Sequence, residues 1–381
     1  MIVAGLMSGT SLDAIDLAVA EFTWRGPDLA LRRLHHAEHP WPPATRARLL
    51  AALPPQPTSM AELCALDVLA GEAFGAVAAQ AEGAALVASH GQTVFHWVEG
   101  GRARGTMQIG QPACIVEATG LPVVSDFRAR DVAGGGQGAP LASTLDALWL
   151  GGDGVARAAL NLGGIANVTM VGGGRALAFD TGPANCLMDV HAARVTQGAQ
   201  AADVDGRIAR AGRVRADALA RLLADPYYAR PPPKSTGREH FDAGYVARRL
   251  AGLPPLGDAD LMATLAELTA ATVAHACAAH GVAEVVASGG GARNPALMDA
   301  LRRRLAPVPL TSSAARGMPE DAKEAYLFAL LGFLTWHGVP GALAGATGAR
   351  VPRVLGRISP GDAPLALPPP HLAPRRLLIE G

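Results

Sequence analysis

The chain has 381 residues with 33 basic and 33 acidic side chains, so its formal net charge is zero. No basic block stands out, and we therefore expect no nucleic-acid partner. The length exceeds what a single hydrophobic core usually supports, which predicts two lobes with small molecules bound between them.

The four cysteines lie far apart and form no CxxC pair, at Cys64, Cys114, Cys186 and Cys277. We interpret them as reduced thiols in a cytoplasmic protein. The apolar N-terminus lacks a basic region and carries two early aspartates, which is not the pattern of a signal peptide. Every other long apolar run is interrupted by Gly, Pro or charge, so we expect no membrane span.

The first elements along the chain form a predicted β-hairpin. Residues 2–7 (IVAGLM) and 14–22 (AIDLAVAEF) alternate as strands, and the polar turn SGTSLD joins them. The same order of strand, glycine turn and strand returns at RAALNLGGIANVTMVGGG (157–174), followed by the strand RALAFD (175–180). Two such hairpins half a chain apart predict a duplicated fold.

Helices and short strands alternate through the rest of the chain. Apolar spacing predicts helices at 44–53, 62–83, 204–212 and 216–223, a long helix from about residue 260 to 281, and a helix opened by Pro319, Glu320 and Asp321. Buried strands are predicted at 84–90, 121–127 and 283–288, and the proline-rich C-terminal segment is expected to run over the surface. This alternation predicts α/β lobes with mixed sheets.

The first turn, SGTSLD, is a candidate phosphate-binding segment. The amides of Gly9 and Ser11 and the hydroxyls of Ser8, Thr10 and Ser11 offer donors, and small residues let the backbone approach a phosphate. The alternative is a Ser/Thr-rich hairpin turn without a ligand.

Two further glycine turns follow strands, NLGGIAN (161–167) and SGGGARN (288–294). Neither a Walker A loop nor a Rossmann fingerprint is present, but three such turns together favour a nucleotide held between two lobes. The distribution of asparagine supports this interpretation. The chain has only four asparagines, and all lie in or near these turns, at Asn161, Asn167, Asn185 and Asn294. Any single one is explained equally well as a turn residue.

Asp180, in FDTGPAN, is the candidate general base. It lies at a predicted strand end with a tight turn immediately after it, a position that suits a carboxylate facing a cleft. A turn-forming or capping role is the alternative.

Polar side chains beyond strand ends are candidate substrate ligands. His90 and Gln92 follow one predicted strand, and Arg128 and Asp131 follow another; an arginine there can bind a carboxylate with two hydrogen bonds. His90 also fits a role in terminating its strand. Glu324 lies beside Lys323 on the helix after Pro319, and the scarcity of lysine argues against a solvated Lys323.

The sequence resembles the anhydro-N-acetylmuramic acid kinases over most of its length. The matching stretches are GLMSGTSLDAIDLA, ASHGQTVFH, SDFRARDVAGGGQGAPL, NLGGIANVT, FDTGPANCLMD, PPPKSTGREHF, DLMATLAELTA, SGGGARNP, DAKEAYLFALLG and GATGA. Ala14 and Ala184 stand where the family usually has glycine. The resemblance implies an actin, sugar-kinase and Hsp70 type of fold. We place the lobes at 1–145 with about 345–381, and at 146–344.

The resemblance also implies the activity and the ligands. ATP, water and 1,6-anhydro-N-acetylmuramic acid would give N-acetylmuramic acid 6-phosphate and ADP in peptidoglycan recycling, with Mg²⁺ bound near Asp13 or Asp16 and a homodimer as the assembly. Asp180 matches the catalytic aspartate. The segment matched to ATP phosphate comprises Gly9, Thr10, Ser11, Leu12, Asp13, Ala14, Ile15 and Asp16. To these we add, from the later glycine turns, Asn161, Gly163, Gly164, Gly289, Gly290 and Asn294.

Two alternatives stay open. An ordinary hexose or amino-sugar kinase would phosphorylate a free hydroxyl, with Asp180 deprotonating the sugar instead of water. A chaperone-like ATPase of the Hsp70 type would need a peptide-binding domain, and the tail beyond GATGA is too short and proline-rich to form one.

Overall fold

The computed structural model describes residues 1–172, 175–237 and 239–380. The chain divides into two compact units, Met1–Trp149 with Ala322–Gly381, and Leu150–Asp321. Residues 322–344, expected in the second lobe, therefore lie in the first unit, because the helix they contain packs on the first sheet.

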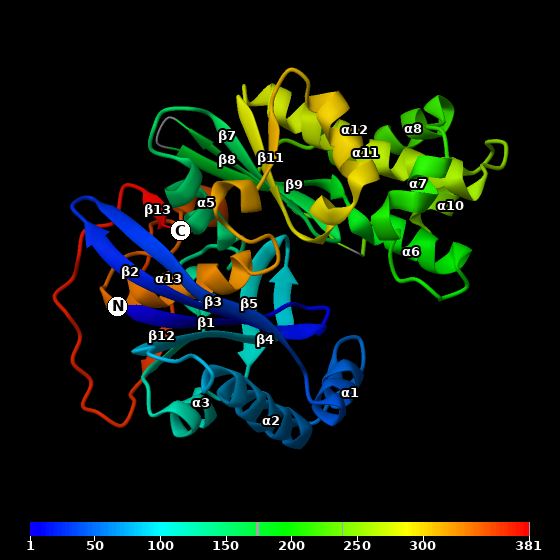
Figure 1. The fold of residues 1–381 in the computed structure, drawn as a ribbon. Coiled ribbons are helices and arrows are strands. Elements are labelled where there is room, and N and C mark those ends of the chain that lie inside the picture. The colour runs from blue at the N-terminus through cyan, green and yellow to red at the C-terminus, as the bar shows by residue number, and fades with distance from the viewer. Residues whose placement is uncertain (173–174, 238, 381) are drawn as a thin grey trace. The chain divides into compact units, whose positions relative to one another are not determined.

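The first unit is built on an eight-stranded mixed sheet (Figure 1). Its strands are β1 (Ile2–Ser8), β2 (Ala14–Arg25), β3 (Asp28–Pro40), β4 (Leu86–Glu99), β5 (Arg102–Ile109), β6 (Val123–Ser125), β12 (Arg357–Ser359) and β13 (Leu377–Glu380). They lie in the order β12-β6-β4-β1-β2-β3-β13, and β5 pairs with β4. The C-terminal segment thus adds two edge strands that the sequence did not predict.

Helices cover both faces of this sheet. They are α1 (Pro43–Ala52), α2 (Met60–Ala78), α3 (Pro112–Thr119), α4 (Ala129–Ala133), α5 (Ala142–Leu150), α13 (Lys323–Trp336) and α14 (Ala344–Thr347). Successive side chains of a strand point to opposite faces. Accordingly Ala4 and Leu6 of β1 join the core that contains Phe74 of α2, while Gly5 faces α13, where a Cβ would lie 2.6 Å from the Ala329 nitrogen.

The second unit is built on a five-stranded sheet. Its strands are β7 (Arg157–Leu162), β8 (Ile165–Gly172), β9 (Arg175–Pro183), β10 (Glu284–Ser288) and β11 (Leu310–Ser312), in the order β11-β10-β7-β8-β9. The turn expected between β8 and β9 lies at residues 173–174, outside the described part of the chain.

The helical elements of the second unit are mostly short. They are α6 (Asn185–Val195), η1 (Val204–Gly206), α7 (Arg207–Ala211), α8 (Ala216–Leu223), α9 (Pro226–Ala229), α10 (Tyr245–Leu250), α11 (Asp258–Ala279), η2 (Gly290–Arg293), α12 (Pro295–Leu305) and η3 (Ala314–Arg316). In the described part of the chain, α11 is the one helix long and apolar enough to cross a membrane. Most of it is buried in the core of this unit, as in the central helix of a globular domain.

Both units share one topology, which confirms the predicted duplication. In the first, β1, β2 and β3 are antiparallel, β4 returns parallel to β1, and β6 lies parallel to β4. In the second, β7, β8 and β9 are antiparallel, β10 returns parallel to β7, and β11 lies parallel to β10. Each unit is an α/β layer structure with a mixed sheet, as expected from the sequence.

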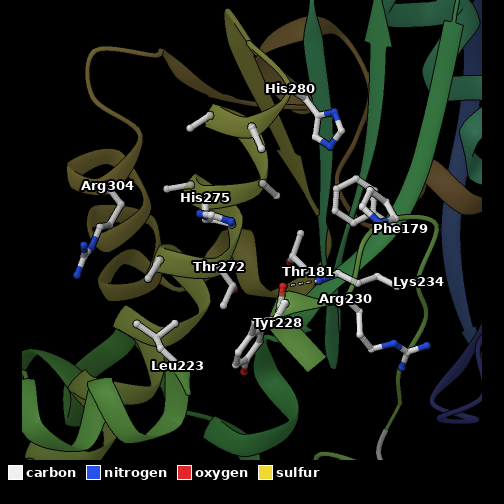
Figure 2. Close-up of a pocket in the computed structure, with 17 residues that line it drawn as sticks. Phe179, Thr181, Leu223, Tyr228, Arg230, Lys234, Thr272, His275, His280 and Arg304 are labelled. Carbon is white, nitrogen blue, oxygen red and sulfur yellow. Dashed lines mark hydrogen bonds between the residues drawn. The ribbon is translucent and has the colours of Figure 1, made fainter. Parts of the chain in front are cut away.

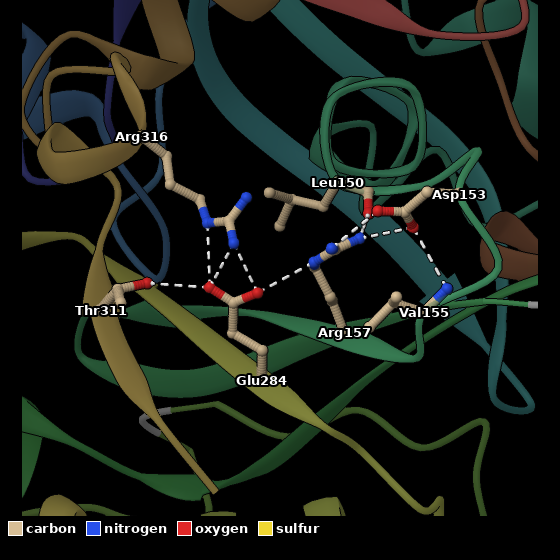
Figure 3. Close-up of polar contacts among 7 residues, drawn as sticks. All are labelled: Leu150, Asp153, Val155, Arg157, Glu284, Thr311 and Arg316. Carbon is tan, nitrogen blue, oxygen red and sulfur yellow. Dashed lines mark hydrogen bonds and ion pairs between the residues drawn. The ribbon is translucent and has the colours of Figure 1, made fainter.

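A network of ion pairs fixes the two segments where the chain enters and leaves the second unit (Figure 3). Arg157 donates to Glu284, to both carboxylate oxygens of Asp153 and to the Leu150 carbonyl. Arg316 donates to both oxygens of Glu284. Arg157 thereby holds residues 150 and 153 to β7, and Glu284 of β10 joins Arg157 to Arg316.

Candidate functional site

Asp180 lies near the end of β9, beside a β-bulge. Asn167 of β8 pairs with Asp180 and Ala166 pairs with Gly182, so β9 carries an extra residue at Thr181. Bulges re-aim side chains and are frequent beside active sites. The Asp180 Oδ2 atom accepts a hydrogen bond of 2.9 Å from the Thr236 N–H.

The environment of Asp180 raises its proton affinity. The pKa of Asp180 is raised to about 6: burial is the largest cause, the Thr236 N–H lowers the pKa, and the Glu239 carboxylate raises it. A carboxylate with a pKa near 6 is ionised at neutral pH and is a stronger base than an ordinary aspartate. These are the properties of a general base.

A cavity of about 670 Å³ lies beside β9, α11 and the segment 228–234 (Figure 2). Phe179 and Thr181 line it, whereas Asp180 between them does not. Because alternate side chains of a strand point to opposite faces, the cavity lies on the other face of β9 from the carboxylate. It is therefore separate from the candidate catalytic group.

The first glycine turn is braced from outside by two residues. Trp41 donates to Ser8 Oγ at 3.0 Å, and Arg46 donates to the Leu12 carbonyl at 2.7 Å. Leu12 and Ile15 are buried, so their side chains anchor the turn and only their backbone is available to a phosphate.

Three of the hydroxyl and carboxylate groups that the sequence assigned to phosphate and Mg²⁺ lie in the exposed part of this turn. Thr10, Ser11 and Asp13 are exposed, and Ala14 and Asp16 are half-buried at the start of β2. A Cβ on Gly9 would meet only Ser11 Oγ, at 3.5 Å. Packing within the protein therefore does not require glycine at this position.

The second and third glycine turns differ in what they require. A Cβ on Gly289 would lie 2.5 Å from Asn161 Oδ1, and its φ is +84°, so packing and conformation both require glycine. At Gly163 and Gly290 a Cβ would find no atom closer than 3.7 Å. The Gly164 carbonyl accepts from the Ala184 and Cys186 N–H groups at the start of α6.

Asn294 has a structural role at the start of α12. Its Oδ1 accepts from the N–H groups of Ala296 and Leu297 and caps α12, and its Nδ2 donates to the Asp203 carbonyl. Asparagine is among the best N-cap residues. The protein's own backbone thus uses both ends of this amide, and the assignment of Asn294 to ATP stays a prediction.

His90 and Arg128 form a pair in the first unit. Arg128 Nε donates to His90 Nε2 at 2.9 Å, and Arg128 Nη1 donates to the Gly138 carbonyl. Burial, and then the Arg128 charge, hold the pKa of His90 well below its ordinary value. The neutral ring accepts through Nε2 and carries its proton on Nδ1, which has no hydrogen-bond partner among the described residues.

Gln92 and Asp131 are fully buried and bind the chain itself. Gln92 donates to the carbonyls of Gly9 and Thr93. Asp131 accepts from the Gly138 N–H and from the Thr347 hydroxyl, one bond on each oxygen. In this structure Asp131 shapes the glycine-rich segment 134–138, and a direct contact between Asp131 and substrate stays a prediction.

The first turn of α13 presents two charges with different surroundings. Lys323 is buried and forms an ion pair of 2.6 Å with the buried Asp146, as the scarcity of lysine suggested. Glu324 is exposed. The helix begins at Lys323 and not at Pro319, so both residues lie in its first turn.

Sequence reasoning missed the residues that hold Asp180. Tyr227 donates its hydroxyl to the Asp180 carbonyl at 2.7 Å, and the Asp180 N–H donates to the Lys234 carbonyl at 3.0 Å. The presence of Lys234 and Thr236 in a segment otherwise dominated by proline was the available signal, but no spacing rule connects residue 180 to residues 227–236.

The duplicated sheet, with Asp180 on the third strand of its second copy, agrees with the actin and sugar-kinase type of fold that the sequence resemblance implies. Solved structures with a similar chain path include a ROK family glucokinase from Streptomyces griseus in complex with glucose and AMPPNP. It is 15% identical with a TM-score of 0.37, over 86% of this chain and 97% of that chain. The activator of the 2-hydroxyisocaproyl-CoA dehydratase from Clostridium difficile is 13% identical with a TM-score of 0.42, over 87% of this chain and 94% of that chain.

The family model of anhydro-N-acetylmuramic acid kinase matches residues 1–361. Anhydro-N-acetylmuramic acid kinase of Streptomyces coelicolor is 54% identical over 99% of this chain and 98% of its own length. The enzyme of the same name from Rhodococcus erythropolis is 49% identical over the full length of both chains. The chain belongs to the anhydro-N-acetylmuramic acid kinase family.

Proposed function

We propose that this chain cleaves the internal bridge of 1,6-anhydro-N-acetylmuramic acid with water and phosphorylates the released O6 with ATP, in peptidoglycan recycling. The products are N-acetylmuramic acid 6-phosphate and ADP. The observation that carries this proposal is the half-buried Asp180 carboxylate, whose pKa is about 6 and whose Oδ2 atom accepts a hydrogen bond from the Thr236 N–H. Membership in the kinase family supports the same reaction.

Asp180 acts on water in this mechanism. Its Oδ1 atom accepts a proton from the water molecule that attacks the anomeric carbon, and the bond from that carbon to the bridge oxygen breaks. In an ordinary inverting glycosidase a second carboxylic acid protonates the leaving oxygen. Here the γ-phosphoryl group of ATP captures that oxygen, so a single protein carboxylate is sufficient.

The first turn fits the phosphate groups of ATP. Gly9 leaves room for close approach to its amide, and Thr10 and Ser11 present exposed hydroxyls. We assign phosphate binding to these residues, and we keep Asn161, Gly163, Gly164 and Gly290 as proposed nucleotide ligands in the second unit. Phosphoryl transfer depends mainly on such positioning and charge neutralisation.

Mg²⁺ fits the residues of the first turn. The described residues contain no group of three or more His, Cys, Asp or Glu side chains that could enclose a metal ion, and Mg²⁺ commonly binds through one or two carboxylates, waters and substrate phosphates. The Asp13 side chain is accessible to such an ion because it is 77% exposed, and its ion pair with Arg46 is long at 3.8 Å. The bound ion would neutralise phosphate charge, and Asp13 or Asp16 would orient it through water.

We assign the lactyl carboxylate of the substrate to Arg128 and its sugar to the region of His90, whose Nδ1–H is a buried donor. Glu324 remains a proposed sugar ligand because its side chain is exposed near the charge of Arg128.

From the family resemblance we also propose a cytoplasmic homodimer. Light scattering of the purified protein tests the dimer, and a single monomeric mass would contradict it.

The experiment that tests the substrate compares phosphorylation of anhydro-N-acetylmuramic acid with that of N-acetylglucosamine, both with ATP. We expect turnover of the anhydro sugar only. Preferential phosphorylation of N-acetylglucosamine would establish the alternative, an ordinary amino-sugar kinase. The same assay with an anhydro sugar that lacks the lactyl group tests Arg128, because Arg128→Ala should abolish the preference for the lactyl group; an unchanged preference would dismiss this role.

A further inference from the structure

Lys234 is the only lysine in the second unit. Its Nζ atom donates to the carbonyls of Tyr227 and Tyr228, at 3.2 and 3.1 Å. The same atom lies 4.7 Å from the centroid of the Tyr227 ring, within range of a cation–π contact. The lysine therefore ties the segment 231–237 to α9 through two backbone carbonyls and one ring.

The segment 231–237 and Tyr227 together hold Asp180 at three atoms. The backbone of the segment accepts from the Asp180 N–H at Lys234 and donates to the carboxylate at Thr236. Tyr227, the residue that Lys234 contacts, donates to the Asp180 carbonyl at 2.7 Å. Asp180 is thus fixed on its backbone nitrogen, its backbone oxygen and one carboxylate oxygen, and every one of these bonds comes from residues 227–236.

The buried carboxylate of Asp225 accepts hydrogen bonds from the residues that flank the segment 231–237. It accepts from the Tyr227 N–H at 2.9 Å, from the Tyr245 hydroxyl at 3.1 Å and from His240 Nε2 at 3.2 Å. The start of α9 and the residues that follow the segment are therefore fastened to one side chain. Lys234 provides the remaining attachment, in the middle of the segment.

We propose that Lys234 and Tyr227 are positioning residues for the base: they keep the segment 231–237 packed against Asp180, and this packing sets the direction of the carboxylate. The inference rests on the proposed function, since it assigns Asp180 as the base. Lys234 acts through backbone carbonyls and needs no contact with substrate. This role also explains why a chain almost without lysine retains one here.

A direct phosphate contact is the competing role for Lys234. The geometry favours positioning, because the ammonium group directs hydrogen bonds to two carbonyls of its own chain. The two roles differ in what they change. A phosphate ligand alters the KM for ATP, whereas a positioning residue alters kcat and its pH dependence.

The test measures kcat against pH, the KM for ATP and the melting temperature for wild type, Lys234→Met, Lys234→Arg and Tyr227→Phe. Arg230→Met is the matched control, because Arg230 carries the same charge and lies 5.6 Å from the Tyr227 ring centroid, whereas the carbonyls of Tyr227 and Tyr228 are held by Lys234. We expect kcat at pH 8 to fall about 10- to 100-fold in Lys234→Met, as for lost hydrogen bonds from a charged group. Tyr227→Phe should lose about tenfold, as for one neutral hydrogen bond.

The pH dependence separates positioning from a loss of folding. Burial is the largest cause of the raised pKa of Asp180, so a loosened segment admits water and moves the acid limb of kcat below pH 6 in Lys234→Met. The KM for ATP should change less than about twofold, Lys234→Arg should recover part of the activity, and Arg230→Met should match wild type.

Two results overturn the inference. One is a folded Lys234→Met or Tyr227→Phe variant with wild-type kcat, and the other is a Lys234→Met variant whose loss lies in the KM for ATP. If Lys234→Met does not fold, Tyr227→Phe decides alone, since it removes a single hydroxyl. A wild-type enzyme without an acid limb near pH 6 would instead contradict the proposed function, so the two failures are distinguishable.

Discussion

Asp180 combines two properties that oppose each other in a folded protein. Burial makes it a stronger base, but the same burial makes its ionised form costly. Such a residue is expected to favour catalysis at the expense of stability. Two predictions at the scale of this residue follow from its geometry and its pKa.

Asp180→Asn should lose about a thousandfold or more in turnover, within the range that one general base supplies. The amide retains an oxygen for the Thr236 N–H, and the exposed first turn is unchanged, so ATP binding should persist. Steady-state kinetics and calorimetric titration with ATP measure the two quantities. Near-normal turnover in this variant would show that another group activates water.

The same substitution should stabilise the protein at neutral pH. The pKa of Asp180 in the folded chain, about 6, lies above its ordinary value of 3.8. The folded state therefore holds the proton more tightly, and stability falls as the pH rises from about 4 to about 6. At pH 7.5 the cost is about 3 kcal/mol, which Asp180→Asn removes. Urea denaturation of both proteins at pH 4.5 and 7.5 checks this, and equal pH dependence would refute it.

At the scale of elements, the glycine in the turn between β1 and β2 differs from two glycines that the packing of the protein requires. Gly5 is required by the close approach of α13, and Gly289 by a φ of +84° beside Asn161. Gly9 meets neither requirement, because a Cβ there would touch only Ser11 Oγ at 3.5 Å. Its backbone is free to approach a ligand.

Gly9→Ala should therefore leave the midpoint of thermal unfolding nearly unchanged and weaken ATP binding about tenfold, since the added methyl group enters the space assigned to phosphate. Gly105→Ala is the matched control, because the nearest atom to its added Cβ is also a side-chain atom at 3.5 Å, on Trp97. Equal ATP affinity in the two variants would remove the first turn from the proposed nucleotide site.

The elements also show what sequence patterns can and cannot predict. Alternation and glycine turns are local, so β1, β2, β7 and β8 and the duplication were predictable. The segment SHGQTVFH was expected to follow its strand, but it lies within β4, because β5 pairs with it from residue 92 onward. The cap that Asn294 forms on α12 is local, but its bond to Asp203 and the bond between Asp131 and Thr347 join residues 91 and 216 positions apart, and no local pattern contains that information.

At the scale of the whole molecule, the chain passes between the units near residues 149 and 322. The Arg157–Glu284–Arg316 network holds both passages to the second sheet, and Glu284 and Arg157 are only 13% and 11% exposed. Burial raises the pKa of Glu284, but the two guanidinium groups outweigh it and hold the pKa below its ordinary value. The carboxylate therefore stays ionised and binds Arg316 and Arg157, and Arg157 in turn binds Leu150 and Asp153.

Glu284→Ala should destabilise the second unit by about 3 kcal/mol, because it leaves the largely buried Arg157 charge without one of its partners. Urea denaturation followed by circular dichroism measures the loss. Glu62→Ala, which breaks the exposed pair with Arg48, is the control and should change stability little. If the free energy of unfolding falls no more than in that control, the network does not stabilise the two segments where the chain enters and leaves the second unit.

The central claim is that one carboxylate couples hydrolysis to phosphorylation, and isotope labelling tests it most directly. The measurement is mass spectrometry of the product formed from ATP and 1,6-anhydro-N-acetylmuramic acid in ¹⁸O-labelled water. The account predicts one heavy oxygen, on the anomeric carbon of N-acetylmuramic acid 6-phosphate, and no such product from Asp180→Asn. Release of ADP without labelled sugar phosphate would contradict it.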